Sequence, residues 1–119
     1  MTSTLVRHWR RCSGNIHPDD QLFFDSLTHS FNLDYPPPAY IGDVEKASVV
    51  ILFANGGYHE EKTPTEFATA QKTRDFICHL HSPGPVESRD VIDYWAPFRA
   101  LLTSGRACVV NACATARSR

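Results

Sequence analysis

The sequence predicts an α/β domain in which helices cover both faces of an open parallel sheet. Two apolar runs carry this prediction, because residues 48–54 and residues 107–110 show no regular alternation of polar and apolar side chains. A strand without such alternation is typical of a parallel sheet that is buried on both faces. Helical segments separate the two runs, and parallel strands need a crossover of this kind, which is right-handed. We therefore expect a three-layer αβα arrangement.

The bulk composition predicts one globular domain over residues 1–119. The chain of 119 residues has 42% hydrophobic and 21% charged residues, which are ordinary values, and no apolar run as long as a membrane-spanning helix. The net charge of -1 argues against a surface devoted as a whole to nucleic acid. Four scattered cysteines lack the spacing of a zinc or redox site, and the start lacks a secretory signal, so we expect a reducing, cytoplasmic setting.

The first part of the chain predicts a leader and a helix. Residues 1–15 are polar and arginine-rich, and we interpret them as a loose leader or a short helix. Residues 17–33 predict a helix, because Pro18 suits a first turn and the two aspartates after it suit the positive end of the helix dipole. Apolar side chains recur at helical spacing on one face of this segment, which predicts core contacts. They are Phe23, Phe24, Leu27 and Phe31.

The remaining elements follow the first part as a connector, two strands and two helical stretches. Residues 34–47 contain three consecutive prolines and predict an extended connector. After the first strand, residues 63–81 begin with a Thr-Pro-Thr-Glu capping box and predict a helix. Residues 88–105 predict a further helical stretch that divides at Pro97 and ends at Gly105, just before the second strand.

An asparagine follows each predicted strand. Asn55 comes directly after the first strand and Asn111 directly after the second. Because ligands of open parallel sheets bind outside the carboxyl ends of the strands, we expect both side chains to face one crevice. A carboxamide both donates and accepts hydrogen bonds, which suits reading the edge of a base or positioning a water. Taken singly, each asparagine is more typical of a turn, and only the pair together suggests a site.

Four residues extend the polar segment beyond the first asparagine. They are Gly56, Gly57, Tyr58 and His59. The glycines allow close approach of a ligand to the backbone, or simply a sharp turn, and the two rings after them are expected over the crevice. Glu60 and Glu61 are interpreted as residues that favour the start of the next helix.

The sequence lacks the motifs of a phosphate loop, a dinucleotide fold and a serine nucleophile. His79 and His81 are spaced to face different sides of a helix, so we expect no metal site there.

Two segments resemble the active-site motifs of the uracil-DNA glycosylase superfamily. Residues 49–59, VVILFANGGYH, are similar to its first motif, in which an apolar strand enters a Gly-Gln-Asp-Pro-Tyr-His or Gly-x-Asn-Pro-Gly loop. Residues 109–118, VVNACATARS, are similar to its next strand motif, in which an apolar run ends in Asn and leads to Thr-x-Arg. The spacing and the tryptophan-bearing stretch between the motifs also fit. The resemblance spans about residues 36–118.

The resemblance implies hydrolysis of the N-glycosidic bond of a flipped-out deoxyuridine in DNA, with neither a metal nor a redox cofactor. Asn55 would orient the attacking water, Tyr58 would wall the base pocket, and Asn111 would read the uracil edge. His59 and the two glycines before Tyr58 would complete the substrate-binding loop.

The sequence also departs from the pattern of the family. Phe53 stands where the family has glycine, Gly56 stands where it has proline, and no counterpart of a later His-Pro-Ser motif follows. We therefore expect a partial domain that is truncated after its second core strand. Such a domain would expose a sheet edge beside residues 107–110, which favours self-association.

Three functions are consistent with these features. The first is a base-excision glycosylase that acts on uracil-containing DNA. The second is a non-catalytic, truncated or degenerate member of the superfamily, acting as a nucleic-acid or protein-binding module. The third is a different α/β hydrolase or nucleotide-binding protein that uses the same crevice. The sequence leaves open whether the chain is catalytically active.

Overall fold

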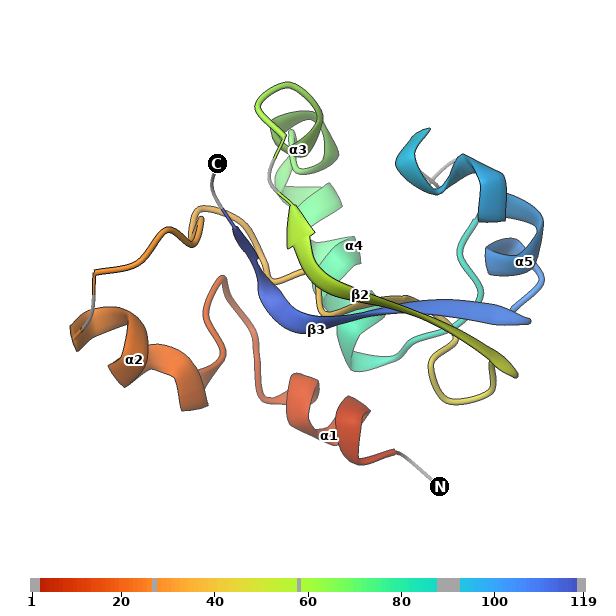
Figure 1. The fold of residues 1–119 in the computed structure, drawn as a ribbon, viewed down its shortest axis with the longest axis horizontal. Coiled ribbons are helices and arrows are strands. Elements are labelled where there is room, and N and C mark those ends of the chain that lie inside the picture. Colours follow the sequence, from red (N-terminus) through yellow and green to blue (C-terminus); the bar gives the residue numbers. More distant parts are fainter. Residues whose placement is uncertain (1–2, 27, 58, 88–92, 118–119) are drawn as a thin grey trace.

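A small mixed sheet with helices around it forms the protein. The computed structural model describes the chain from residue 3 to residue 117, apart from residues 27, 58 and 88–92. The α/β class predicted from the sequence is confirmed at this level (Figure 1). The elements in chain order are α1 (Thr4–Arg10), η1 (Pro18–Asp20), α2 (Gln21–Ser26), β1 (Tyr40–Gly42), β2 (Val49–Gly57), α3 (Lys62–Glu66), α4 (Ala70–His81), η3 (Asp93–Phe98), α5 (Arg99–Thr103) and β3 (Ala107–Arg117).

The sheet has three strands in the order β1-β3-β2. β2 and β3 are parallel, as predicted, with Val49 beside Ala107 and Phe53 beside Asn111. β1 pairs with β3 in the antiparallel direction, so the prediction of an all-parallel sheet is wrong for the described strands. β1 lies inside the segment that we expected to be an unpaired connector. Its three residues follow the prolines too closely to leave a strand pattern in the sequence.

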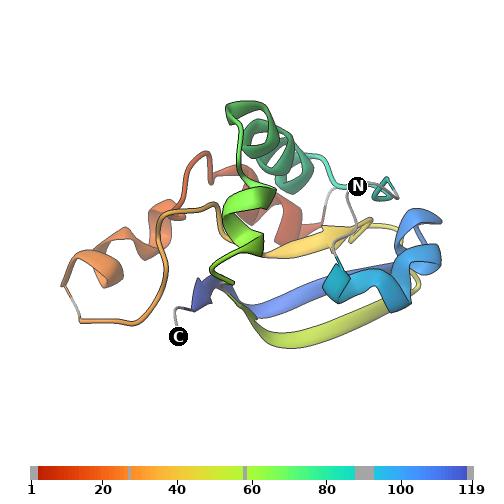
Figure 2. The ribbon, with the colours of Figure 1, turned by 90° about the horizontal axis from the view of Figure 1, so that it is seen from above.

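β2 lies at the edge of the described sheet, and the prediction of a central strand buried on both faces is wrong. Three of its side chains are large, apolar and exposed: Val49 at 46%, Val50 at 57% and Leu52 at 69%. Ile51 and Phe53 instead pack against the cluster that contains α5. Figure 2 shows the reason, because α1 and α4 gather on the β1 side of the sheet and leave β2 at the opposite margin. An apolar run without alternation therefore indicates that both faces of the strand carry apolar side chains. It does not indicate that other elements of the fold cover both faces.

The core consists of two clusters on opposite faces of the sheet. Val110 packs against the first cluster and Val109 belongs to the second, as expected for neighbours in a strand, which point to opposite faces. The first cluster joins α1, β1 and α4 through buried side chains, and the second joins β3, η3 and α5. The members of the first cluster are Val6, Trp9, Cys12, Ala39, Tyr40 and Leu80, and those of the second are Trp95, Leu102 and Val109.

Of the two interpretations of residues 1–15, the short helix is observed, and α1 is part of the core. Two polar contacts fix the end of α1 against the end of α4. Arg10 donates from Nε to the carbonyl oxygen of His81 at 2.8 Å, and Nε2 of His81 lies 2.7 Å from the carbonyl oxygen of Cys12.

A further hydrogen bond joins β1 to α4. The Tyr40 hydroxyl donates to the carbonyl oxygen of Leu80, and burial raises the pKa of Tyr40 to about 12.

The helix predicted over residues 17–33 is only partly present. Pro18 begins η1 as expected, but α2 ends at Ser26, and Leu27 lies outside the described residues. The predicted core stripe is wrong, because Phe23 is 47% exposed. The ring of Phe24 contacts the rings of nearby residues in the chain, with its centroid 5.6 Å from that of Phe31. A helix this short presents no continuous face to the sheet, and α2 lies apart from it (Figure 1).

The exposed margin of β2 leads to the first prediction. We expect self-association through β2, not through residues 107–110, because β3 is the central strand and is paired on both sides. No described strand pairs with the outer edge of β2, and an apolar edge of this kind is a template for another chain. Replacing Leu52 with lysine is expected to shift sedimentation towards the monomer, and the control Leu22→Lys, at a residue that is even more exposed, is expected to leave it unchanged. A monomer at all concentrations of the unaltered chain would contradict this expectation.

Candidate functional site

The two motif strands lie side by side. β2 and β3 form a parallel pair in which Asn55 is beside Cys113 and Asn111 is beside Phe53. The two asparagines are therefore two residues apart along the pair. The prediction that both strands end in asparagine is wrong, because β2 continues to Gly57 and β3 continues well beyond Asn111.

Asn111 holds the proline-rich connector against the sheet. Its side chain is buried, and Nδ2 donates to the carbonyl oxygen of Pro38 at 2.5 Å. Its backbone N–H donates to the carbonyl oxygen of Ala39 at 3.0 Å. One amide N–H is thus used within the fold, while a carboxamide has a second N–H and an oxygen for other partners.

The predicted loop after Asn55 is mostly strand. Asn55, Gly56 and Gly57 belong to β2, with an irregular register between Asn55 and Gly57. The structure describes the backbone of Asn55 but not its side chain. Tyr58 lies outside the described residues. The structure therefore places the backbone of this motif at the end of the parallel pair.

His59 is exposed and stands at the start of α3. Its Nδ1 accepts the backbone N–H groups of Glu61 and Lys62, both at 3.3 Å. Its own N–H donates to Oγ1 of Thr63 at 3.0 Å. Since the first N–H groups of a helix lack partners within the helix, His59 acts as a cap for α3. The Glu60–Glu61 pair lies before this helix, as expected.

The single helix predicted over residues 63–81 is divided into α3 and α4. Thr63 lies inside α3 and is not its cap, so the predicted capping box is wrong. Thr69 caps α4, because its Oγ1 accepts the N–H of Lys72 at 3.1 Å. The interruption at residues 67–69 turns the chain, and it brings the end of α3 and the start of α4 to the same wall of a groove.

Phe53, which stands where the glycosylase motif has glycine, packs against η3. Its ring meets the buried ring of Trp95 edge to face, with the centroids 4.9 Å apart and the planes at 76°. Edge-to-face aromatic pairs are favourable beyond the area that they bury. This contact joins the middle of β2 to the tryptophan-bearing segment between the two motifs.

A groove of about 770 Å³ lies between α4 on one side and η3 with α5 on the other. It is lined by Ile41, Thr65, Glu66, Phe67, Lys72, Asp75, Phe76, His79, Pro85, Val86, Glu87, Trp95 and Leu102. None of the site residues predicted from the sequence is among them. Phe53, which is beside Asn111 in the sheet, contacts Trp95 in the wall of the groove.

Glu66 is a groove residue that the sequence analysis missed. The sequence assigned it to a capping box, whereas the structure places it at the last position of α3, half-buried in the groove. Burial raises the pKa of its carboxyl group, and the nearby Lys62 ammonium opposes this shift. No local sequence signal indicates this environment, because the groove is formed by residues that are far apart in the chain.

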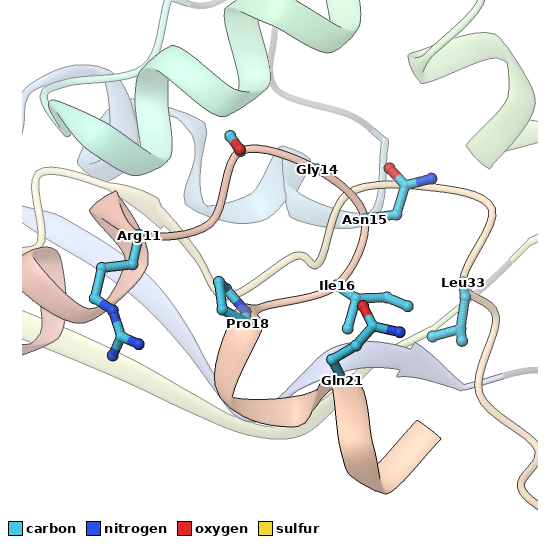
Figure 3. Close-up of a pocket in the computed structure, with 8 residues that line it drawn as sticks. Arg11, Gly14, Asn15, Ile16, Pro18, Gln21 and Leu33 are labelled. Carbon is cyan, nitrogen blue, oxygen red and sulfur yellow. The ribbon is translucent and has the colours of Figure 1, made fainter. Parts of the chain in front are cut away.

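A second cavity, of about 580 Å³, lies at the loop between α1 and η1. It is lined by Arg11, Ser13, Gly14, Asn15, Ile16, Pro18, Gln21 and Leu33 (Figure 3). Its only charged lining residue is Arg11, whose guanidinium donates to both carboxylate oxygens of Asp19, at 2.6 and 3.0 Å. Figure 3 shows Arg11 on the far side of the loop from Gln21 and Leu33, so the polar groups do not converge on a ligand.

His8, His17 and Asp19 form the one group of side chains in the described part of the chain with the spacing of metal ligands. Both ring nitrogens of the buried His17 are already used. Nδ1 accepts the N–H of Asp19 at 3.0 Å, and Nε2 donates to the carbonyl oxygen of His8 at 2.8 Å. The His8 ring stacks on the His17 ring, with the centroids 3.8 Å apart. We interpret this cluster as a structural contact between α1 and η1.

Comparison with known proteins adds no relative. No family model, no curated protein and no solved structure matches this chain. Among the described residues, no helix has both the length and the apolar character needed to cross a membrane.

The His8 cluster leads to a prediction of pH dependence. Burial and the neighbouring His17 lower the pKa of His8 below its usual 6.5, against the opposing effect of Asp19 and Asp20. The unfolded chain therefore binds the proton more readily, so this contribution to stability is complete above pH 6.5 and is lost as the pH falls through the folded-state pKa. We expect Tm to fall on acidification and His8→Phe to reduce that dependence. His29→Phe, outside the cluster, is the control, and an equal effect of both variants would contradict the assignment.

Proposed function

We propose that the chain is a uracil-DNA glycosylase-like domain that hydrolyses the N-glycosidic bond of a flipped-out uracil in DNA. The observation that carries this proposal is the parallel pairing of β2 with β3, because it lays the two motif segments side by side. Ligands of parallel sheets bind beyond the carboxyl ends of the strands, the direction in which both segments run. The motif order and this adjacency together favour the glycosylase over an unrelated nucleotide-binding protein.

In this proposal Asn55 positions the attacking water and Asn111 reads the edge of the base. A carboxamide orients a water well but is a weak base, so the reaction relies on positioning and on the departure of the base. Extrusion of the base from the DNA costs a few kcal/mol, which pocket contacts offset. Gly56 and Gly57 allow the sugar to approach the backbone, Tyr58 walls the base, and His59 closes the loop beside α3.

The finer architecture belongs to the same proposal. We infer a three-layer αβα arrangement of the domain. The two hydrophobic clusters on opposite faces of the sheet support the layering. Uracil-containing DNA is the proposed partner and the cytoplasm the proposed location. No metal or redox cofactor has a role in the reaction as proposed.

A non-catalytic binding module is the second candidate, and two contacts favour it. Asn111 is already hydrogen-bonded to Pro38, and Nδ1 of His59 is already used in capping α3. Both side chains would then serve the fold alone. Binding to a uracil-containing oligonucleotide that weakens steeply with salt, without release of uracil, would support this candidate, because phosphate contacts release counterions.

A uracil-release assay separates the two candidates. The unaltered chain is compared with Asn55→Ala and Asn111→Ala on one uracil-containing oligonucleotide. Release that depends on both asparagines supports the glycosylase, and DNA binding without release supports the binding module.

A further inference from the structure

We propose that β2 pairs with β2 of a second copy of this chain, in the antiparallel direction and about a two-fold axis at Ile51. The product is a closed dimer in which one continuous sheet runs through both copies. This interface goes beyond the proposed function, because it pairs residues 49–53 of the two copies and uses neither of the two asparagines. It gives the expected self-association a definite partner, direction and register.

The outer edge of β2 carries hydrogen-bonding groups of the backbone that the described sheet does not use. On the inner edge, Val49 donates its N–H to the carbonyl oxygen of Arg106 at 3.1 Å, where the pairing with β3 begins. Because the N–H and C=O groups of successive residues point to opposite edges of a strand, those of Val50 and Leu52 point away from β3. No described backbone group outside the sheet bonds to either residue. A partner that satisfies these groups is itself an extended strand.

The side chains of β2 favour a second copy as this partner. Val50 and Leu52 are apolar and exposed at the margin of the sheet (Figure 2). Residues 47–58 contain neither a charged side chain nor a proline, which are features that keep edge strands apart. A charged partner would lose water without gaining an opposite charge, so the matching strand is uncharged and apolar. β2 of a second copy has this composition, and we commit to it.

The opposite edge of the described sheet is already occupied, which makes the assembly a closed dimer. The N–H of Gly42 in β1 points away from β3 and donates to Nε2 of His79 on α4 at 3.1 Å. The carbonyl oxygen of Gly42 accepts the N–H of Val44 at 3.0 Å. Pairing of β2 with β1 of another copy would have to displace these contacts. Pairing of β2 with itself displaces nothing, and its two-fold symmetry closes the assembly.

The exposed side chains fix the register of the pair. Residues that lie opposite each other in an antiparallel pair direct their side chains to the same face. With the axis at Ile51, Val50 of each copy lies opposite Leu52 of the other, so four apolar side chains form one patch. A shift of two residues would place Leu52 opposite Ser48 or Val50 opposite Ala54, and each shift loses apolar contact.

Amide hydrogen exchange, followed by NMR at about 50 µM and about 1 mM, tests the backbone contacts. The N–H groups of Val50 and Leu52 are expected to exchange several-fold more slowly at the higher concentration, because each donates to the partner strand. The N–H of Ile51 faces β3 and is expected to exchange slowly at both concentrations. Protection of Val50 and Leu52 that does not depend on concentration would place another segment on this edge and overturn the proposal. Fast exchange of both groups at both concentrations would also overturn it.

Charged variants test the register by sedimentation equilibrium. Val50→Lys and Leu52→Glu are each expected to weaken the homodimer by about tenfold, because each places a charge opposite an apolar side chain. A mixture of the two variants brings the new ammonium opposite the new carboxylate and restores one apolar pair. Its mixed dimer is therefore expected to be at least about threefold tighter than either homodimer. The matched control is a mixture of Leu52→Lys with Leu52→Glu, whose new charges are not opposite each other and are expected to gain less.

Two results of the sedimentation experiment would overturn the proposal. They are equal association of the two mixtures, which contradicts the register, and a monomer of the unaltered chain at both concentrations, which contradicts the interface. Circular dichroism of each variant shows that it is folded, as expected for substitutions of exposed side chains. Because no DNA is present, failure of dimerisation is distinct from failure of uracil release.

Discussion

Replacing Leu80 with alanine is expected to lower the free energy of unfolding by about 2–5 kcal/mol. Leu80 is fully buried on α4 and packs in the cluster that joins α1 and β1. Truncation removes apolar contacts and leaves a cavity that the surrounding elements fill only in part. Small domains have total stabilities of about 5–15 kcal/mol, so this loss is a large fraction of the stability of the chain.

Urea denaturation followed by circular dichroism measures this effect. The matched control is Leu22→Ala, because Leu22 is 82% exposed on α2 and its truncation is expected to change stability by less than about 0.5 kcal/mol. Comparable destabilisation by both variants would show that α1, β1 and α4 do not form the core described here.

Replacing Asn55 with alanine is expected to reduce uracil release by about 10²-fold or more, the size of effect typical for loss of a catalytic positioning group. The melting temperature should change little, because the side chain is assigned to the water and not to the core. Asn111→Ala is expected to reduce release as well, and also to destabilise the fold by about 1–3 kcal/mol, since the half-buried Pro38 carbonyl loses its partner.

Asn15→Ala controls for the loss of a carboxamide as such, since Asn15 lines the cavity at the α1–η1 loop, which has no place in the proposed chemistry. Wild-type release by Asn55→Ala would remove the residue from the mechanism. A loss in Asn111→Ala that stability alone explains would reduce Asn111 to its structural contact with Pro38.

The sequence predicted the positions of the two long strands better than the burial of their side chains. The apolar runs located β2 and β3 and their parallel pairing correctly, because a crossover through helices leaves few other arrangements. It did not predict that Leu52 and Val50 are exposed, because the pattern of a strand does not record where the helices pack. The continuation of β3 beyond Asn111 was also missed, since its small and polar residues look like a loop.

Helix ends were the other source of error. Pro18 and Gly105 marked real boundaries, and Gly105 has the positive φ of 77° that such a stop requires. The Thr-Pro-Thr-Glu capping box failed because His59, four residues before Thr63, supplies the cap. The groove residue Glu66 was beyond sequence reasoning, because the groove also takes residues that follow much later in the chain, such as Trp95 and Leu102.

Release of free uracil from a uracil-containing single-stranded oligonucleotide by the unaltered chain tests the central claim most directly. The glycosylase proposal predicts time-dependent release, with an abasic site left in the DNA, and no release of thymine from the matched thymine oligonucleotide. Absence of uracil release with the protein in molar excess over the oligonucleotide would contradict it.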